Sequence, residues 1–528
     1  MTAGNNAKNG ADKAHVVADQ SEALDFLAEA RTHGLDEPPK RIDTHGAVVF
    51  LAGEDVYKVK RAVKFPFMDL STLEKRKSAC EAEIAVNKAD APDIYLRAVP
   101  ITRDSGELKI GGDGEPVEWA VHMRRFDETQ TLDQVAERDG LSPELLARLV
   151  RAILASHARA PWGEAEPAAD SLRQYLKQNR DAFGESPELF PPKRVKALID
   201  RSERLLSEVW ALLIRRGQAG FVRRCHGDLH LRNIALIDGA PTLFDAVEFD
   251  DAIATGDVLY DLAFLLMDLW ERGLKREASI VLNRYLWGGG EQQIEGLAAL
   301  PLFLSIRAAI RSKVTAASLP HLADAEREGA AADARRYFAA AESFVEPSAP
   351  RLIAVGGLSG SGKTTVSAEI APLIGRPPGA IHFRSDIERK LQAGVGETER
   401  LPPDSYTQEA SDAVYAALRS KAGAALGAGY SVVVDAVHAR PCERDAIEAV
   451  AAAAGAPFTG LWLDAAVDTL VGRVGARKGD ASDATEAVVR DQARLDVGKI
   501  GWTRIDASGD AAEEAFDLIR KPTLRVPK

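Results

Sequence analysis

The chain has 528 residues, which is too long for one ordinary hydrophobic core and suggests two or three domains. Apolar residues make up 46% of the sequence and charged residues 28%, the balance of a water-soluble globular protein. The formal net charge of −12 argues against binding to nucleic acid, because that function needs a positive surface. We therefore expect no nucleic-acid partner.

Targeting and cross-linking signals are also absent from the sequence. The three cysteines lie far apart and form no CxxC pair, so they support neither a disulfide framework nor a zinc site. Residues 1–20 contain no apolar core of a secretory signal, and their polar composition predicts disorder. The longest apolar run, residues 258–270, is too short to span a bilayer and includes Asp261 and Asp268. We expect a cytoplasmic protein without a membrane partner.

The first ordered segment has the pattern of a sheet followed by a helix. From about Arg41 the chain shows short β-branched runs, interrupted at residues 53–55 by a predicted hairpin turn. Residues 71–88 then have the composition of a helix, with Ser71 and Glu74 at capping-box spacing.

The rest of the chain divides into a helical part and an alternating part. Strands are predicted near 94–101 and 117–126, and beyond Thr131 the chain is largely helical as far as Phe344. The two prolines that follow indicate a linker. The sequence therefore predicts four segments: a disordered N-terminus at 1–20, a first domain at 21–344, a linker at 345–350 and a second domain at 351–528.

Short apolar runs and helical segments alternate throughout the second domain. This βαβα order predicts a parallel sheet with helices on both faces. Between the first strand and the first helix lies GLSGSGKT, which matches the phosphate-loop pattern G-x-x-x-x-G-K-[ST]. Its backbone N–H groups and the helix N-terminus can bind phosphate, Lys363 can reach the β- and γ-phosphates, and Thr364 can hold Mg²⁺. The nucleotide-binding candidates are Gly357, Ser359, Gly360, Ser361, Gly362, Lys363, Thr364 and Thr365.

Phosphoryl transfer also needs a base and a metal-binding carboxylate. Asp386 follows the second strand, at the edge of the sheet where ligands bind, and is a candidate catalytic base with Arg389 as a substrate-binding residue. A helix N-cap is the alternative for Asp386. Asp435 ends the strand YSVVVD and suits a Mg²⁺ contact, although an ordinary strand-end turn would look the same.

A helix further on carries Arg473 and Arg477, four residues apart, before the polar loop KGDASDAT. The pattern indicates a lid that brings cationic side chains to the reacting phosphoryl group, or else a solvated helix face. Residues 351–520 resemble the small P-loop kinases that include gluconate kinases and zeta-toxin-type kinases. The shared elements are the phosphate loop, the Asp-x-x-Arg after the second strand and the arginine-bearing lid.

The first domain contains a second catalytic motif, His226-Gly227-Asp228, followed by Asn233. The D-x-x-x-x-N spacing is that of a kinase catalytic loop, in which Asp228 would accept the proton of the incoming hydroxyl. The oxygens of Asn233 and of Asp245, which ends the strand PTLFD, could bind Mg²⁺.

Such a centre also needs a strand lysine paired with a helix glutamate. The strand VYKVK offers Lys58 and Lys60, which we expect on opposite sides of the strand, so that only one faces the nucleotide. We prefer Lys58, with Glu83 as its partner. For the neighbouring residues, we expect Lys60 to lie on a solvated strand face and Glu81 to be a surface charge.

This half resembles the aminoglycoside phosphotransferase and choline kinase branch of the protein-kinase-like fold. The resemblance implies a bilobal domain in which Asp245 stands in the place of the metal-binding Asp of D-F-G. The sequence departs from protein kinases because it has no Gly-x-Gly-x-x-Gly loop before Lys58, no glycine after Asp245 and no A-P-E segment. These departures favour a small-molecule acceptor over a protein.

The two resemblances together cover nearly the whole chain. Their combination is similar to a bacterial fusion of the two kinase types. The expected fold is thus a protein-kinase-like domain followed by a P-loop parallel-sheet domain. Acidic residues after Asp245 could form a cradle for a cationic acceptor, but helix capping and loop charge are the simpler explanation for Glu248, Asp250, Asp251, Asp257 and Asp261.

The leading hypothesis is an ATP- and Mg²⁺-dependent phosphotransferase with two active modules that phosphorylate hydroxyl groups of small molecules. The alternative is a regulatory protein in which one module senses ATP and controls the other. A nucleotide-sugar, a macromolecule or an aminoglycoside as acceptor also remains open. The sequence does not identify the acceptor of either module, the preference for ATP or GTP, or the oligomeric state.

Overall fold

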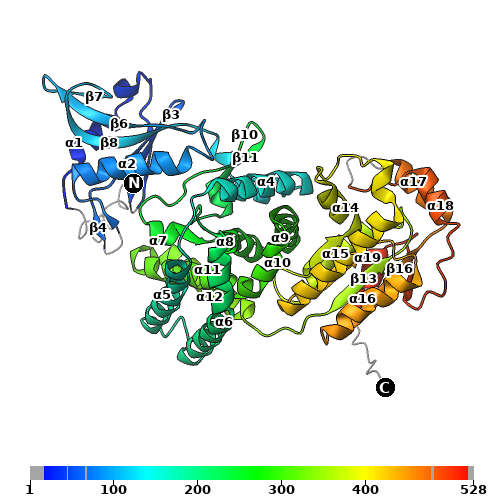
Figure 1. The fold of residues 1–528 in the computed structure, drawn as a ribbon. Coiled ribbons are helices and arrows are strands. Elements are labelled where there is room, and N and C mark those ends of the chain that lie inside the picture. The colour runs from blue at the N-terminus through cyan, green and yellow to red at the C-terminus, as the bar shows by residue number, and fades with distance from the viewer. Residues whose placement is uncertain (1–16, 45, 66–67, 477–480, 521–528) are drawn as a thin grey trace. The chain divides into compact units, whose positions relative to one another are not determined.

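The computed structural model describes residues 17–44, 46–65, 68–476 and 481–520 (Figure 1). The chain divides into two compact units, each built from two segments. Unit 1 consists of Met1–Asp268 and Phe303–Ala341, and unit 2 of Leu269–Leu302 and Glu342–Lys528. The predicted linker lies just after the point where the chain enters unit 2 for the second time. The predicted domain boundaries placed Leu269–Leu302 in the first domain, whereas these residues belong to unit 2.

Unit 1 begins with an antiparallel six-stranded sheet in the order β1-β2-β3-β8-β6-β7. Its strands are β1 (Lys40–Asp43), β2 (Ala47–Ala52), β3 (Asp55–Lys60), β6 (Tyr95–Asp104), β7 (Glu107–Ile110) and β8 (Glu115–Arg124). Ala52 pairs with Asp55, so Gly53 and Glu54 form the two-residue turn of a hairpin, as the sequence predicted. Gly53 has a φ of 63°, a conformation that glycine adopts without strain.

Helix α2 (Leu73–Asn87) packs against β8 and β6. Its N-cap is Thr72, whose side chain accepts a hydrogen bond from the Lys75 N–H at 3.3 Å. The predicted capping box that began at Ser71 is therefore wrong by one residue. The Ser71 hydroxyl instead donates to Asp69, which also accepts from the Ser71 N–H in a local turn.

Only the last four residues of the segment predicted to be disordered belong to the described part of the chain. Residues 1–16 lie outside it. Gln20 is fixed just before α1 (Ser21–Ala28): its amide donates to the Lys60 carbonyl at 2.9 Å and to Glu118 at 2.7 Å. At Gln20 the chain is thus already tied to the sheet.

Helices form most of the rest of unit 1, as the composition predicted beyond Thr131. They are α3 (Leu132–Arg138), α4 (Pro143–Arg159), α5 (Ala165–Gly184), α6 (Pro192–Gln218), α7 (Asp251–Ala254), α8 (Val258–Glu271), α11 (Leu300–Ser318) and α12 (Asp324–Phe344), of which α8, α11 and α12 run across a unit boundary. Three short antiparallel pairs accompany them, formed by β4 (Lys64–Phe65) with β5 (Met68–Asp69), β9 (Val222–Arg224) with β12 (Thr255–Asp257), and β10 (Ile234–Ile237) with β11 (Ala240–Leu243). Short 3₁₀ turns lie between these elements, including η4 (Leu231–Asn233).

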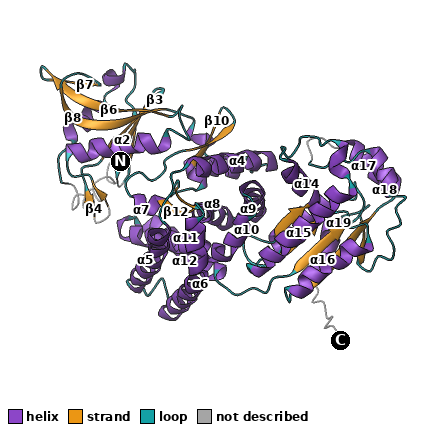
Figure 2. Cartoon of the chain, in the orientation of Figure 1, coloured by secondary structure: helices purple, strands orange, loops and turns teal. Residues whose placement is uncertain are grey.

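Unit 2 contains a five-stranded sheet in the order β14-β15-β13-β16-β17, parallel throughout, which confirms the predicted parallel fold (Figure 2). Its strands are β13 (Leu352–Gly356), β14 (Ile381–Arg384), β15 (Val432–Asp435), β16 (Phe458–Asp464) and β17 (Thr503–Asp506). The helices are α9 (Lys275–Gly289), α10 (Gln292–Gly296), α13 (Lys363–Ile370), α14 (Ser385–Ala393), α15 (Gln408–Gly427), α16 (Pro441–Ala453), α17 (Val467–Ala476), α18 (Glu486–Gln492) and α19 (Ala511–Arg520).

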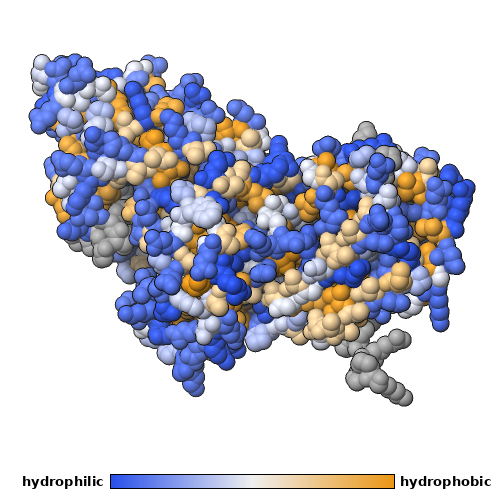
Figure 3. Space-filling view, viewed as in Figure 1, coloured by the Kyte–Doolittle hydropathy of each residue, from blue (hydrophilic) through white to orange (hydrophobic). Residues whose placement is uncertain are grey.

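Among the residues that the structure describes, one helical stretch, Gln292–His321, is long and apolar enough to cross a membrane, and an 18-residue window within it has a mean hydropathy of 1.4. However, 83% of that window is buried inside the protein, as in the core helix of a globular protein. On the face drawn in Figure 3, hydrophilic and hydrophobic residues are interspersed. Burial thus accounts for the hydrophobicity of this helix.

Candidate functional site

In unit 1, Lys58 connects the sheet, helix α2 and the segment that follows β11, where Asp245 lies two residues beyond the end of the strand at Leu243 and not at the strand end as predicted. Its Nζ donates to Glu83 at 2.9 Å and to Asp245 at 2.8 Å. Burial opposes the charge on Lys58, but the two carboxylates outweigh that effect and raise its pKa well above the ordinary value. The structure therefore brings together the lysine, glutamate and aspartate that the sequence singled out.

The neighbouring Lys60 corrects one of our expectations. Residues two apart in a strand point to the same face, so Lys60 shares a face with Lys58 and does not lie on the solvated side. It is 4% exposed and forms ion pairs with the second oxygen of Glu83 and with Glu248. Burial favours neutral Glu83, but the two ammonium groups prevail and lower its pKa.

The turn that contains Asp228 supplies the second group of this site. The Asn233 amide nitrogen donates at 3.0 Å to both the backbone carbonyl and the carboxylate of Asp228. His230 lies 3.4 Å from the same carboxylate. Burial would raise the pKa of Asp228, but the interaction with His230 and other positive groups lowers it to about 2. Asp228 is thus a carboxylate at neutral pH, the form that can accept a hydroxyl proton.

Two carboxylates of α8 hold this turn in place, and sequence reasoning missed them. Asp261 accepts the Gly227 N–H at 2.8 Å, and Asp268 accepts the Leu231 N–H at 3.0 Å. Both carboxylates are buried. The sequence signal was available, because two aspartates inside an otherwise apolar helix need buried partners. Here the partners are backbone amides of the turn that contains Asp228.

The acidic residues after Asp245 have partners within the protein. Asp250 caps α7, and Asp257 caps the start of α8 while it forms a bidentate pair with Arg216 at 2.6 and 2.8 Å. The remaining pairs are Glu248 with Lys60, Asp251 with Arg224, and Asp261 with Gly227 and His157. These contacts favour the structural interpretation of the acidic group over a cradle for a cationic acceptor.

A cavity of about 270 Å³ lies beside these groups in unit 1. Its lining includes Gly46, Lys58, Asp228, Asp245 and Phe249. The Asp245 side chain is 45% exposed beside the cavity, and the amide group of the buried Asn233 contacts the carboxylate of Asp228, so carboxylate and amide oxygens lie at this site. Such oxygens are the ligands that Mg²⁺ prefers, and the residues present therefore fit a magnesium nucleotide.

In unit 2, the phosphate loop joins β13 to α13, as predicted. Gly360 and Gly362 have φ values of 87° and 88°, which favour glycine. A Cβ added at Gly360 would lie 2.6 Å from the Leu470 carbonyl oxygen, whereas one added at Gly362 would meet open space. The loop is thus closely packed at one glycine and open at the other, as a cradle for phosphate requires.

Gln492 of α18 also contacts this loop, and the sequence did not reveal it. Its side-chain oxygen accepts the Ser359 N–H at 2.8 Å, while the Lys363 ammonium donates to the Leu358 carbonyl at 2.9 Å. Thr365 is exposed on α13. These contacts define the shape of the loop.

Asp435, at the end of β15, accepts the Thr364 hydroxyl at 2.6 Å. The ring of His382 and the guanidinium of Arg384 lie 3.7 and 4.0 Å from the same carboxylate oxygen. Burial would raise the pKa of Asp435, but His382, Lys363 and Arg384 lower it to about 2. The pair formed by Thr364 and Asp435 offers two oxygen atoms of the kind that Mg²⁺ binds.

Asp386 lies in the first turn of α14, and the N-cap of that helix is Arg384. Burial raises the pKa of Asp386, and the charge of Asp435 adds to the rise. Arg389 donates to the Ser405 carbonyl at 2.6 Å and to the Ser411 hydroxyl at 3.3 Å. In this structure Arg389 therefore braces the loop before α15, and its predicted contact with a substrate stays a prediction.

The predicted arginine lid is described only in part. Arg473 lies on α17 and donates to the Ala507 carbonyl at 2.7 Å, whereas Arg477 lies outside the described residues. Further along, Asp483 accepts hydrogen bonds from Lys390 at 2.7 Å, the Leu401 N–H at 3.0 Å and the Tyr406 hydroxyl at 2.6 Å. This carboxylate ties the segment before α18 to the loop that follows α14.

Two regions of the chain match known families. Residues 101–297 match the phosphotransferase enzyme family, and residues 352–495 match a family described as an AAA domain. Among solved structures, a choline/ethanolamine kinase family protein from Mesorhizobium loti is 17% identical, covering 62% of this chain and 98% of its own, with a TM-score of 0.35. A gluconokinase from Sinorhizobium meliloti 1021 is 21% identical, covering 32% and 91%, with a TM-score of 0.23.

Two whole-length relatives come from mycobacteria. Uncharacterized proteins of Mycobacterium tuberculosis strain H37Rv and of Mycobacterium bovis are each 31% identical over 482 residues, which is 88% of this chain and 92% of theirs. The matched regions confirm the resemblance to a phosphotransferase followed by a P-loop kinase. The chain belongs to the family of these mycobacterial proteins and is a kinase-type enzyme.

Proposed function

We propose that the protein is an ATP- and Mg²⁺-dependent phosphotransferase with two separate centres, each of which phosphorylates a hydroxyl group of a small molecule. The observation that carries the proposal is the placement of Lys58, between Glu83 and Asp245, beside the cavity that Asp228 also lines. A lysine that is only 18% exposed and is held by two carboxylates beside an ionised aspartate is the arrangement that phosphoryl transfer needs.

In the first centre, Lys58 would orient the nucleotide phosphates, with Glu83 fixing the position of the lysine. Asn233 and Asp245 would hold magnesium, which would neutralise the charge of the transferring phosphoryl group when bound. Asp228 would accept the proton of the acceptor hydroxyl, because its pKa of about 2 keeps it ionised at neutral pH. The position of this turn depends on Asp261, which fixes the Gly227 amide.

In the second centre, the backbone N–H groups of the phosphate loop and Lys363 would bind the phosphates, while Thr364 and Asp435 would hold the metal. Asp386 would act as the base. Its pKa is raised above the ordinary value, and a more basic carboxylate takes a proton more readily. Arg473 and Arg477 remain candidates for stabilising the phosphoryl group, and Arg389 for binding the acceptor.

The acceptors are proposed as small hydroxyl compounds, such as sugars or related metabolites. The lack of an A-P-E segment and of a glycine-rich loop supports a small molecule over a protein at the first centre. The protein is proposed to work in the cytoplasm as two catalytic modules in one chain.

The test measures transfer from γ-labelled ATP to a panel of sugars, amino sugars and amino alcohols. Asp228→Asn should abolish transfer to one acceptor class and Lys363→Ala to another. The matched controls, Asp238→Asn and Lys499→Ala, change exposed residues and should keep the wild-type rate. If neither active-site variant lowers acceptor-dependent turnover, the proposal fails. A variant of one centre that also abolishes turnover at the other would instead favour the regulatory alternative.

A further inference from the structure

Helix α9 meets the parallel sheet of unit 2 along its edge strand β14. The Asn283 side-chain oxygen accepts the His382 N–H at 2.7 Å, and the Trp287 indole donates to the His382 carbonyl at 3.2 Å. At an edge strand these two backbone groups have no neighbouring strand to bind. Helix α9 thus completes the hydrogen bonding of the strand that leads directly to Arg384.

A row of alternating charges then connects α9 with the metal-binding carboxylate. Arg284 of α9 pairs with Glu397 through two contacts, at 2.7 and 3.4 Å. The same glutamate lies 3.9 Å from Arg384, and Arg384 lies 4.0 Å from Asp435. The order is therefore Arg284, Glu397, Arg384 and Asp435, with alternating positive and negative charge.

Glu397 interacts with two arginines, Arg284 and Arg384. While Arg284 holds Glu397, less of that charge is available to Arg384, and Arg384 stays near Asp435 as a competitor for any cation that Asp435 binds. Without Arg284, Glu397 interacts with Arg384 alone and attracts it more strongly. Without the charge of Glu397, Arg384 keeps Asp435 as its negative partner. Removing one or the other member of this ion pair should therefore change the cation affinity of Asp435 in opposite directions.

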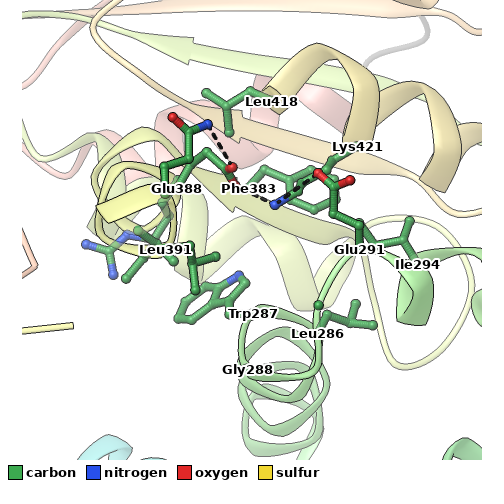
Figure 4. Close-up of a pocket in the computed structure, with 14 residues that line it drawn as sticks. Leu286, Trp287, Gly288, Glu291, Ile294, Phe383, Glu388, Leu391, Leu418 and Lys421 are labelled. Carbon is green, nitrogen blue, oxygen red and sulfur yellow. Dashed lines mark hydrogen bonds and ion pairs between the residues drawn. The ribbon is translucent and has the colours of Figure 1, made fainter. Parts of the chain in front are cut away.

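Arg384 also has space to shift. A cavity of about 340 Å³ lies between the α9–α10 segment and helices α14 and α15, and its lining includes Trp287, Arg384, Glu388 and Lys421. Figure 4 shows the Trp287 ring on one side of this cavity, with Glu388 and Lys421 joined by an ion pair of 2.6 Å. The Arg384 guanidinium lies 6.0 Å from the centre of the Trp287 ring.

We propose that Arg284 and Glu397 are positioning residues that set the magnesium affinity of the second centre through Arg384. This inference rests on the proposed function, because it assumes that Thr364 and Asp435 bind the metal of a nucleotide. It assigns to helix α9, which lies far from the phosphate loop in the sequence, a part in the electrostatics of that centre.

The experiment measures ADP binding to the full-length protein by calorimetry, with Mg²⁺ and with EDTA. Asp245→Asn serves to remove Mg²⁺-dependent ADP binding at the first centre. The part of the binding signal that is lost when Lys363→Ala is added then belongs to the second centre. The measured quantity is the ratio of the two ADP affinities, which reports on the metal site. ADP binding in EDTA reports on the phosphate loop and should stay within twofold in all variants of the ion pair.

Glu397→Gln should lower the ratio of the ADP affinity with Mg²⁺ to that with EDTA about fivefold, and Arg284→Ala should raise this ratio about fivefold. This is the effect of moving one unit charge to or from a site about 4 Å away in a water-like dielectric. Arg284→Lys keeps the charge and should stay near the wild type. The matched controls are Arg276→Ala and Glu369→Gln, which remove an exposed pair of 2.8 Å between α9 and α13 and should change nothing.

The outcomes separate this inference from the proposed function. If ADP binding to the otherwise unmodified second centre gains nothing from Mg²⁺, the proposed function of that centre fails. If magnesium enhances binding but the two variants shift the ratio in the same direction, or not at all, the inference is wrong. A merely structural contact would lower ADP affinity in EDTA as well, and the thermal unfolding midpoint of each variant would show it.

Discussion

Glu83 is the residue on which the cationic cluster of unit 1 depends. It is fully buried, and its two oxygens each form an ion pair with a lysine, Lys58 or Lys60. Glu83→Gln keeps the shape of the side chain but removes the negative charge between two ammonium groups, of which that of Lys60 is buried and that of Lys58 is partly buried. The change should therefore destabilise the contact between α2 and β3 without creating a cavity.

The size of the effect follows from these contacts. Removing one partner of a buried ion pair costs about 3–5 kcal/mol. Each lysine keeps another carboxylate, Asp245 for Lys58 and Glu248 for Lys60, so we expect the lower end, about 3 kcal/mol. Glu81→Gln on the same helix is the matched control. That side chain is 56% exposed, and its loss should cost about 0.5 kcal/mol or less.

Hydrogen exchange in increasing urea, read from peptides of α2 and β3, gives the free energy of opening for this part of unit 1. The pKa of Glu83 is lowered in the folded protein, so its contribution is fully present above the ordinary pKa of 4.5 and is lost as the pH falls below it. The difference between wild type and Glu83→Gln should therefore shrink in acid. Equal opening free energies for Glu83→Gln and Glu81→Gln at pH 7 would refute the reasoning.

Three further outcomes are expected. Because the pKa of Asp228 is about 2, kcat/KM of the first centre, measured in a Lys363→Ala background, should show no acidic limb between about pH 5 and 8, and a limb there would exclude Asp228 as the base. Gly460→Ala places a Cβ 2.3 Å from the Trp502 ring and should destabilise unit 2 by about 1–3 kcal/mol in urea unfolding. Asp483→Ala removes three hydrogen bonds and should speed proteolysis of the loop after α14 about tenfold, whereas an unchanged rate would show that the carboxylate does not restrain this loop.

Much of the first site could be predicted because its groups carry local signals. The spacing of Asp228 and Asn233 and the apolar run before Asp245 are visible within twenty residues of sequence, although the strand itself ends at Leu243, two residues before Asp245. Asp261 and Asp268 could not be placed in the same way. Their partners are backbone N–H groups 34 and 37 residues earlier in the chain, and any residue type can supply such a group.

The second site shows the same division. The phosphate loop and the strand-ending Asp435 were predicted from motifs whose residues are contiguous. Arg284 and Glu397, by contrast, are 113 residues apart, and an arginine on a helix carries no signal of the glutamate that it will meet. Arg389 was singled out from its spacing to Asp386, but the loop that it braces depends on folding beyond that motif.

Helices α8 and α9 follow each other in the chain, and the match to the phosphotransferase family runs through both, to residue 297. Even so, α9 supplies side chains that cover the outer edge of β14. Cutting the gene at the proline-containing linker would therefore produce a C-terminal fragment with bare backbone donors and acceptors along that strand. Such an exposed edge recruits other strands, so the isolated fragment should self-associate during expression, and a useful truncation must retain α9.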